Sequence, residues 1–126
     1  MPTAFVGRQL SLLPVKSEHE FFPADEVPWT ADGPGISQRV LSQDPEDGTL
    51  TRLARWAPGT DTSPAGVIRH EYYEEVYLLE GSLTDLTLGR TFTVGQYASR
   101  RPGMPHGPYR TDEGCTMLEI RYNPPR

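Results

Sequence analysis

Polar and apolar side chains alternate along short stretches of this chain, and the alternation predicts strands. Between residues 50 and 57, and again between 116 and 122, side chains at odd and even positions differ in polarity. Neighbouring side chains of a strand point to opposite faces, so each stretch predicts one apolar face and one wet face. The longer period of an amphipathic helix is nowhere visible in the sequence.

Glycine and proline break the apolar runs into pieces of strand length. The chain has 12 glycines and 13 prolines among 126 residues, and turns rich in these residues separate the alternating stretches. Short strands separated by such turns are typical of an all-β sandwich or barrel. The predicted strands cover residues 36–42, 49–57, 67–70, 75–81, 82–88, 90–94, 96–100 and 115–122.

The first 35 residues lack this alternation and carry several prolines and glycines after residue 22. We therefore expect residues 1–35 to form an irregular arm that packs on the barrel or on a partner subunit. Residues 36–126 are expected to form the barrel itself. A chain of 126 residues fits a single domain with one core.

Charge and composition restrict the classes of partner and the cellular location that we expect. A formal net charge of −5 repels nucleic-acid phosphates and anionic membrane surfaces, so neither is expected as a partner. The sequence shows no apolar stretch of membrane-spanning length and no signal-peptide core at its start, and we expect a cytoplasmic protein. The single cysteine, Cys115, excludes a thiolate-rich metal site and is expected to be buried as a small hydrophobic residue.

Two of the three histidines lie where a metal site in a small barrel would need them. His70 opens the segment HEYYEEVYLLEG, and His106 ends the segment RRPGMPH. Glu74 follows His70 by four residues, and an even spacing along extended chain places two side chains on one face. Glu75 is the alternative ligand, because a one-residue bulge would exchange the two carboxylates. His19 lies in the arm and is not expected to be a ligand.

The residues around these histidines match two motifs of a known superfamily. The matching positions are His70, Glu74, Gly81, Gly95, Pro102, Gly103 and His106. With these motifs the chain resembles the cupin superfamily over about residues 48–122. The resemblance implies an all-β fold, the jelly-roll barrel or double-stranded β-helix. Two positions depart from the pattern, because Ile68 stands at the usual first histidine and Thr62 at the usual glycine before it.

A closer likeness is to small bacterial cupins of the acetylacetone-dioxygenase and ChrR-like groups. It extends over most of the chain, but the same barrel carries dioxygenases, lyases, isomerases and sensor domains, so it does not define the reaction. The residues that carry this likeness are Asp25, Pro28, Trp29, Asp44, Pro45, Gly48, residues 80–85, Pro102, Gly103, His106, Pro108, Gly114 and Cys115.

Two imidazoles and one carboxylate suit a divalent ion and leave coordination positions open for a substrate. Iron would suit oxygen chemistry on a dicarbonyl or hydroxyketone, whereas manganese, nickel or zinc would suit Lewis-acid chemistry in a lyase. The leading hypothesis is therefore a metal-dependent dioxygenase or lyase that acts on a small oxygenated molecule. We expect Tyr72 and Tyr73 to hydrogen-bond a bound carbonyl, and Arg101 to hold a carboxylate or to orient Glu74.

Two alternatives to this enzyme stay open, and one assembly is expected. The missing histidine at position 68 favours a non-catalytic sensor cupin of the kind attached to anti-sigma factors. A metal-free isomerase or epimerase would use His70 or His106 as its general base. We also expect a homodimer, because the arm is long enough to lie across a neighbour's sheet edge.

Overall fold

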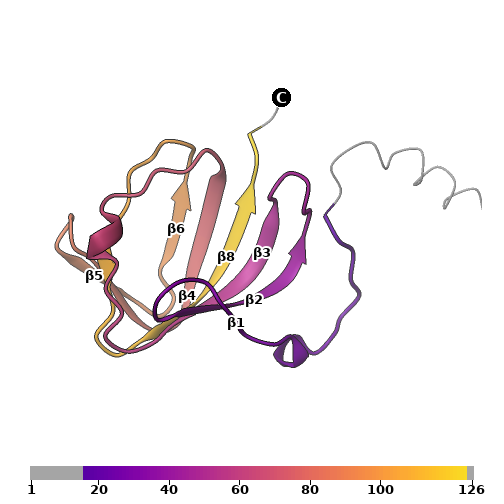
Figure 1. The fold of residues 1–126 in the computed structure, drawn as a ribbon, viewed down its shortest axis with the longest axis horizontal. Coiled ribbons are helices and arrows are strands. Elements are labelled where there is room, and N and C mark those ends of the chain that lie inside the picture. The colour runs from indigo at the N-terminus through magenta and orange to yellow at the C-terminus, as the bar shows by residue number, and fades with distance from the viewer. Residues whose placement is uncertain (1–15, 125–126) are drawn as a thin grey trace, which may run out of the picture.

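The computed structural model describes residues 16–124, which are built almost entirely from antiparallel strands (Figure 1). The strands are β1 (Thr30–Ala31), β2 (Ile36–Gln43), β3 (Leu50–Trp56), β4 (Tyr73–Asp85), β5 (Arg90–Thr93), β6 (Tyr97–Arg100), β7 (Tyr109–Arg110) and β8 (Cys115–Tyr122). Two short 3-10 helices, η2 (Ala24–Glu26) and η3 (Ser63–Ala65), lie in the connections. The predicted all-β jelly-roll is confirmed.

The strands form two walls joined by β4. In the larger wall the order is β1-β2-β3-β8-β4, and β6 pairs with the first half of β4 (Figure 1). The second half of β4 pairs with β5 and β7 and forms the smaller wall. Because β4 belongs to both walls, its side chains reach the interior from both sides.

The long β4 replaces two predicted strands. Residues 75–81 and 82–88 were expected to be separated at Gly81, but the strand runs without interruption from Tyr73 to Asp85. A register shift between Leu78 and Glu80 changes which positions face inward, from even numbers before it to odd numbers after it. The predicted strand over residues 67–70 is absent among the described residues, where only Ile68 pairs, in an isolated bridge with His106.

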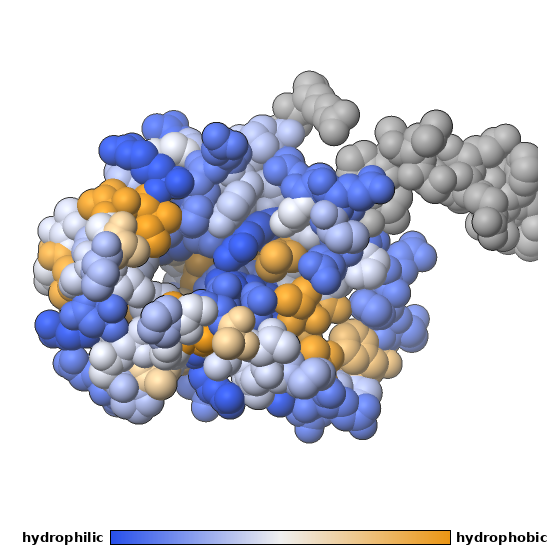
Figure 2. Space-filling view, in the orientation of Figure 1, coloured by the Kyte–Doolittle hydropathy of each residue, from blue (hydrophilic) through white to orange (hydrophobic). Residues whose placement is uncertain are grey.

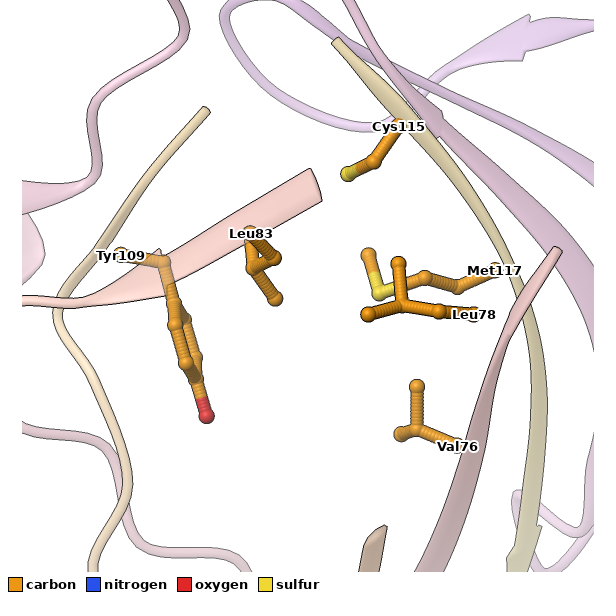
Figure 3. Packing of buried hydrophobic residues seen from close by; sticks show 6 residues of the cluster. All are labelled: Val76, Leu78, Leu83, Tyr109, Cys115 and Met117. Atoms are coloured by element: carbon orange, nitrogen blue, oxygen red, sulfur yellow. The ribbon is translucent and has the colours of Figure 1, made fainter. Parts of the chain in front are cut away.

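A small apolar cluster joins the two walls. Figure 3 shows Val76, Leu78 and Met117 of the large wall on one side, facing Leu83 and Tyr109 of the small wall on the other. Trp56, Phe92 and Ala98 pack against the cluster. Its buried members are Val76, Leu78, Leu83, Tyr109, Cys115 and Met117, so the expected burial of the cysteine is confirmed.

Part of the interior is charged, because the wet faces of β3 and β8 turn inward. Arg52 and Glu119 are paired across these strands, and both are buried. Arg121 pairs with Glu74 of β4 in the same interior layer. The apolar positions Leu53 and Leu118 lie opposite each other on the outer face. The inward face also holds Ala54 and Met117, and the outward face holds the exposed Arg55, so each face mixes polar and apolar residues and the predicted division into one apolar and one wet face is met only in part.

The described part of the arm, residues 16–35, packs on the sheet of its own chain. Lys16 donates a hydrogen bond to Thr51 of β3, and β1 pairs with β2. The Arg39 side chain donates to the carbonyl oxygens of Asp25 and Val27. The rest of the predicted arm, residues 1–15, lies outside the described residues. Between residues 16 and 124, no helix has the length and apolarity to span a membrane.

Candidate metal centre

Three side chains converge inside the cup in a way that suits a metal ion. His70, Glu74 and His106 each offer a ligand atom, and these atoms lie within 4.8 Å of one another. Within this group, Nε2 of His70 lies 4.0 Å from Oε2 of Glu74. The three residues are those expected from the two sequence motifs.

Main-chain hydrogen bonds tie the two motifs together. The N–H of Ile68 donates to the carbonyl oxygen of His106 at 2.8 Å, and the N–H of His106 donates back at 3.0 Å. The N–H of Gly103 donates to the carbonyl oxygen of His70 at 2.8 Å. The loops that carry the histidines are thus held side by side, although the histidines are 36 positions apart in the sequence.

Both imidazoles are in the form that a metal needs. Burial, with a smaller effect from the charge of Arg100, lowers the pKa of His106 to about 4. Burial also lowers the pKa of His70. Both rings are therefore neutral at pH 7 and keep a lone pair. Nδ1 of His106 lies 3.1 Å from the Tyr109 hydroxyl, whereas its buried Nε2 has no hydrogen-bond partner within residues 16–124.

The structure places Glu74 in the interior and Glu75 on the outer face. Glu74 is only 5% exposed and belongs to the even-numbered inward positions of β4. Glu75 instead accepts a hydrogen bond from the hydroxyl of Tyr97 on the outside of the sheet. The register shift lies beyond both residues, so it does not exchange the two carboxylates.

Arg100, and not Arg101, orients the Glu74 carboxylate. Nη1 of Arg100 donates to Oε1 of Glu74 at 2.8 Å, and Nη2 donates to the Tyr109 hydroxyl at 2.7 Å. Arg101 is exposed and lines a separate surface depression, next to Tyr73. Our expectation that Arg101 would orient Glu74 is corrected, because Arg100 is the residue of β6 that pairs with Glu74, whereas Arg101 follows the end of that strand.

The two expected tyrosines are also on different sides of the sheet. Tyr72 lies beside the candidate metal ligands, with its ring stacked on His70 at 4.5 Å between centroids. Tyr73 faces outward and stacks on Tyr122 of β8, with 5.2 Å between centroids. The structure therefore brings Tyr72 to the site and leaves Tyr73 away from it.

A cavity of about 450 Å³ opens in front of the three ligands. Figure 2 shows the cup face, where hydrophilic residues gather at the centre beside apolar ones. The apolar lining includes Ile36, Trp56, Ile68, Val76, Leu83 and Met117. The charged lining consists of Asp32, Arg52, Asp61, Glu74, Arg100, Glu119 and Arg121. The volume suits a small organic molecule.

A buried ion-pair network forms one part of the cavity wall. Nε of Arg52 donates to Oε1 of Glu119 at 3.0 Å, and Nη1 donates to Gln38 at 2.7 Å and to Asp32. Burial raises the pKa of Glu119, although Arg52 opposes this effect. These residues were not among the site residues predicted from the sequence. Their alternation was visible, but it did not reveal that the polar face turned inward.

The donor set fits a divalent ion. Two neutral imidazoles and a carboxylate are typical ligands of such an ion. An arginine that holds the carboxylate is typical of the groups that orient a ligand. His106 also has a buried nitrogen without a partner in the described chain, which a metal would satisfy. Ile68, at the position of the motif's usual first histidine, offers only an alkyl group, so the two motifs supply three candidate ligands among the described residues.

Comparison with solved structures finds the same fold at low sequence identity. An RmlC-like cupin from Shewanella frigidimarina is 19% identical, with a TM-score of 0.67 over 84% of this chain and 91% of that one. An acetylacetone dioxygenase from Acinetobacter johnsonii is 16% identical, with a TM-score of 0.66 over 82% and 74% of the two chains.

A third similar structure is the complex of Rhodobacter sphaeroides SigE with the anti-sigma ChrR, at 20% identity and a TM-score of 0.60. That match covers 79% of this chain and 52% of the other. The comparison with curated proteins gave no match. The family model of the ChrR cupin-like domain matches residues 17–122, so this chain belongs to the ChrR cupin-like family.

Proposed function

We propose that the protein is a metal-dependent enzyme that acts on a small dicarbonyl or hydroxyketone. The reaction is either a dioxygenase-type cleavage of a carbon–carbon bond or a lyase reaction with the metal as Lewis acid. The observation that carries this proposal is the convergence of His70, Glu74 and His106 on one cavity of about 450 Å³. A site with three protein ligands leaves positions open for a substrate, as catalytic metal sites do.

In this proposal the metal supplies Lewis acidity and, if it is iron, a place for oxygen chemistry. His106 would hold the ion through Nε2 in the tautomer whose Nδ1–H donates to the Tyr109 oxygen. Burial raises the pKa of Tyr109 to about 12, so its hydroxyl keeps its proton at pH 7. That proton is then available for a substrate oxygen in the cavity, which Tyr109 also lines.

Metal content tests the ligand set. We expect close to one divalent ion per chain in protein purified without added metal or a histidine tag, measured by elemental analysis. His106→Ala should lose that ion, because only two protein ligands would remain. His19→Ala is the matched control, since His19 is exposed in the arm and contacts Phe22. Equal metal content in all three proteins would refute the ligand assignment.

Turnover tests the reaction. Each metal-loaded form is mixed with acetylacetone, and oxygen uptake and substrate absorbance are followed together. If the protein is a dioxygenase, the iron-loaded form should consume oxygen and diketone in equal amounts, and the forms loaded with other metals should consume neither. Substrate loss without oxygen uptake would indicate the lyase. Turnover that persists in metal-free protein would refute both.

One observation favours a non-catalytic sensor as the second candidate. The chain belongs to the ChrR cupin-like family. A similar solved structure is the complex of the anti-sigma ChrR with SigE. The loss of a ligand at Ile68 is compatible with binding without turnover. A sensor predicts stoichiometric metal, a ligand-dependent shift in melting temperature and no turnover of any tested diketone.

A further inference from the structure

Three arginines line the metal cavity, and two of them donate their hydrogen bonds to other side chains of the protein. Arg52 donates to Glu119, Gln38 and Asp32. Arg100 donates to Glu74 and to the Tyr109 hydroxyl. These two guanidinium groups are therefore committed to positioning neighbouring side chains.

Arg121 is different, because its guanidinium has only loose contacts. Its Nε is buried and has no hydrogen-bond partner within the described part of the chain. The nearest carboxylate oxygens are Oε2 of Glu74, 3.7 Å from Nε, and Oε1 of Glu119, 3.8 Å from Nη2. Both separations exceed hydrogen-bond length. A buried donor without an acceptor is costly, so a bound group that supplies one would be stabilised.

The position of Arg121 is next to the candidate metal. It pairs directly with Glu74 across β8 and β4, so both side chains lie in one interior layer. Its guanidinium lies over the ring of Tyr72, 5.3 Å from the centroid, and Tyr72 stacks on His70.

The charge of the lining also favours an anion once the metal is present. Three arginines face four carboxylates in the cavity, Asp32, Asp61, Glu74 and Glu119. With neutral histidines and all four carboxylates ionised, the cavity lining alone carries one excess negative charge, and a divalent ion changes this to one excess positive charge. Cavities with one sign of charge concentrate ligands of the opposite sign.

We propose that Arg121 binds a carboxylate of the substrate, and that the substrate class is a dicarbonyl or hydroxyketone that bears a carboxylate group. This inference rests on the proposed function, because the carbonyl oxygens are taken to face the metal. Arg121 is then the residue that selects acids over neutral diketones, through a charge-assisted hydrogen bond.

A matched acid and ester test the selection. Zinc-loaded protein, which carries no redox-active metal, is titrated by calorimetry with 4,6-dioxoheptanoate and with its methyl ester. The carboxylate of this acid is separated from the diketone, so the metal contacts of the two probes are alike. We expect the acid to bind about 10- to 100-fold more tightly than the ester, the range for a hydrogen bond to a charged group.

Variants assign the preference to one residue. Arg121→Gln should reduce the acid-to-ester ratio of affinities to within about threefold of one, whereas Arg121→Lys should keep part of it because the charge remains. Arg90→Gln, which changes an exposed arginine of β5 outside the cavity, should keep the full ratio. An unchanged ratio in Arg121→Gln, or no preference in the unsubstituted protein, would overturn the inference.

Zinc content, measured in every variant, separates this inference from the proposed function. If no variant and no unsubstituted protein holds zinc, the proposed metal enzyme fails. The acid-to-ester ratio of the metal-free protein then tests Arg121 by itself, and it should still fall in Arg121→Gln. If zinc binds and the ratio does not depend on Arg121, only the carboxylate selection fails.

Discussion

Gly81 shows how closely two strands of the large wall approach each other. Its φ is 73°, a conformation that favours glycine, and it pairs with Cys115 of β8. A Cβ at this position would lie 1.9 Å from the carbonyl oxygen of Gly114. The glycine favoured a turn between two predicted strands, but the residue lets β4 continue across the junction of the two walls.

We predict that Gly81→Ala lowers the free energy of unfolding by about 3 kcal/mol or more, because backbone strain and a main-chain clash add. Gly89→Ala is the control. Gly89 has a φ of 63°, but a methyl group added there would meet no atom within 4 Å, so only strain of about 1 kcal/mol is expected. Urea denaturation of both variants measures the difference, and equal losses would contradict the close approach.

Cys115 provides a pH-dependent test of burial. Burial raises the pKa of its thiol from 9.0 to about 11 in the folded protein. The unfolded chain therefore releases this proton first, so the stabilisation is complete below pH 9 and is lost as the pH rises through 11. We expect the free energy of unfolding to fall more steeply over this interval than in Cys115→Ala. Parallel curves for the two proteins would show that the thiol does not contribute.

At the scale of elements, β3 and β8 are joined by a buried ion pair as well as by their main-chain ladder. Arg52 and Glu119 face each other across the two strands, and both are nearly inaccessible to solvent. Removing one partner leaves the other buried and uncompensated, which is much more costly than losing both. The pair therefore makes the alignment of these strands sensitive to single substitutions.

We predict that Arg52→Met costs about 3–5 kcal/mol of stability, and that adding Glu119→Leu recovers part of the loss. Arg110→Met is the control, because Arg110 forms an exposed ion pair with Asp112 and should change stability by less than about 1 kcal/mol. Urea denaturation of Arg52→Met, of Glu119→Leu and of the double variant measures the three losses of stability. A double variant as unstable as the sum of both single losses would contradict a coupled pair.

At the scale of the whole molecule, the outer face of the large wall carries an apolar row. Leu53, Leu118, Tyr77 and Tyr97 are successive cross-strand partners on β3, β8, β4 and β6. Tyr77 is 43% exposed and Tyr97 57% exposed. A second copy of the chain that packs on this row through a two-fold axis would cover these rings, which supports the prediction of a homodimer.

Light scattering after size exclusion should therefore give twice the chain mass, and Tyr97→Glu should shift the protein towards the monomer. The substitution adds a charge to an exposed outer position and leaves the cavity unchanged. Thr91→Glu, on the exposed part of β5, is a control that should stay dimeric. A single-chain mass at all concentrations for the unsubstituted protein would end the dimer prediction.

The sequence by itself determined the strand character, the position of most strands and the three candidate metal ligands that the structure brings together. Period-two alternation is a local property, and His70, Glu74 and His106 stand in motifs whose spacing is visible along the chain. Even spacing from His70 favoured Glu74 but left Glu75 as the alternative, and the structure places Glu74 inside because the bulge of β4 lies further along.

Only the tertiary structure decided which face is inside and which neighbours complete the site. Alternation defines two faces but does not say which one the closed barrel encloses, and here the charged face of β3 and β8 lines the cup. Proximity in sequence favoured Tyr73 and Arg101, whereas cross-strand register brings Arg100 and Arg121 to Glu74. Register between distant strands depends on bulges and on closure of the whole sheet, so local sequence does not contain it.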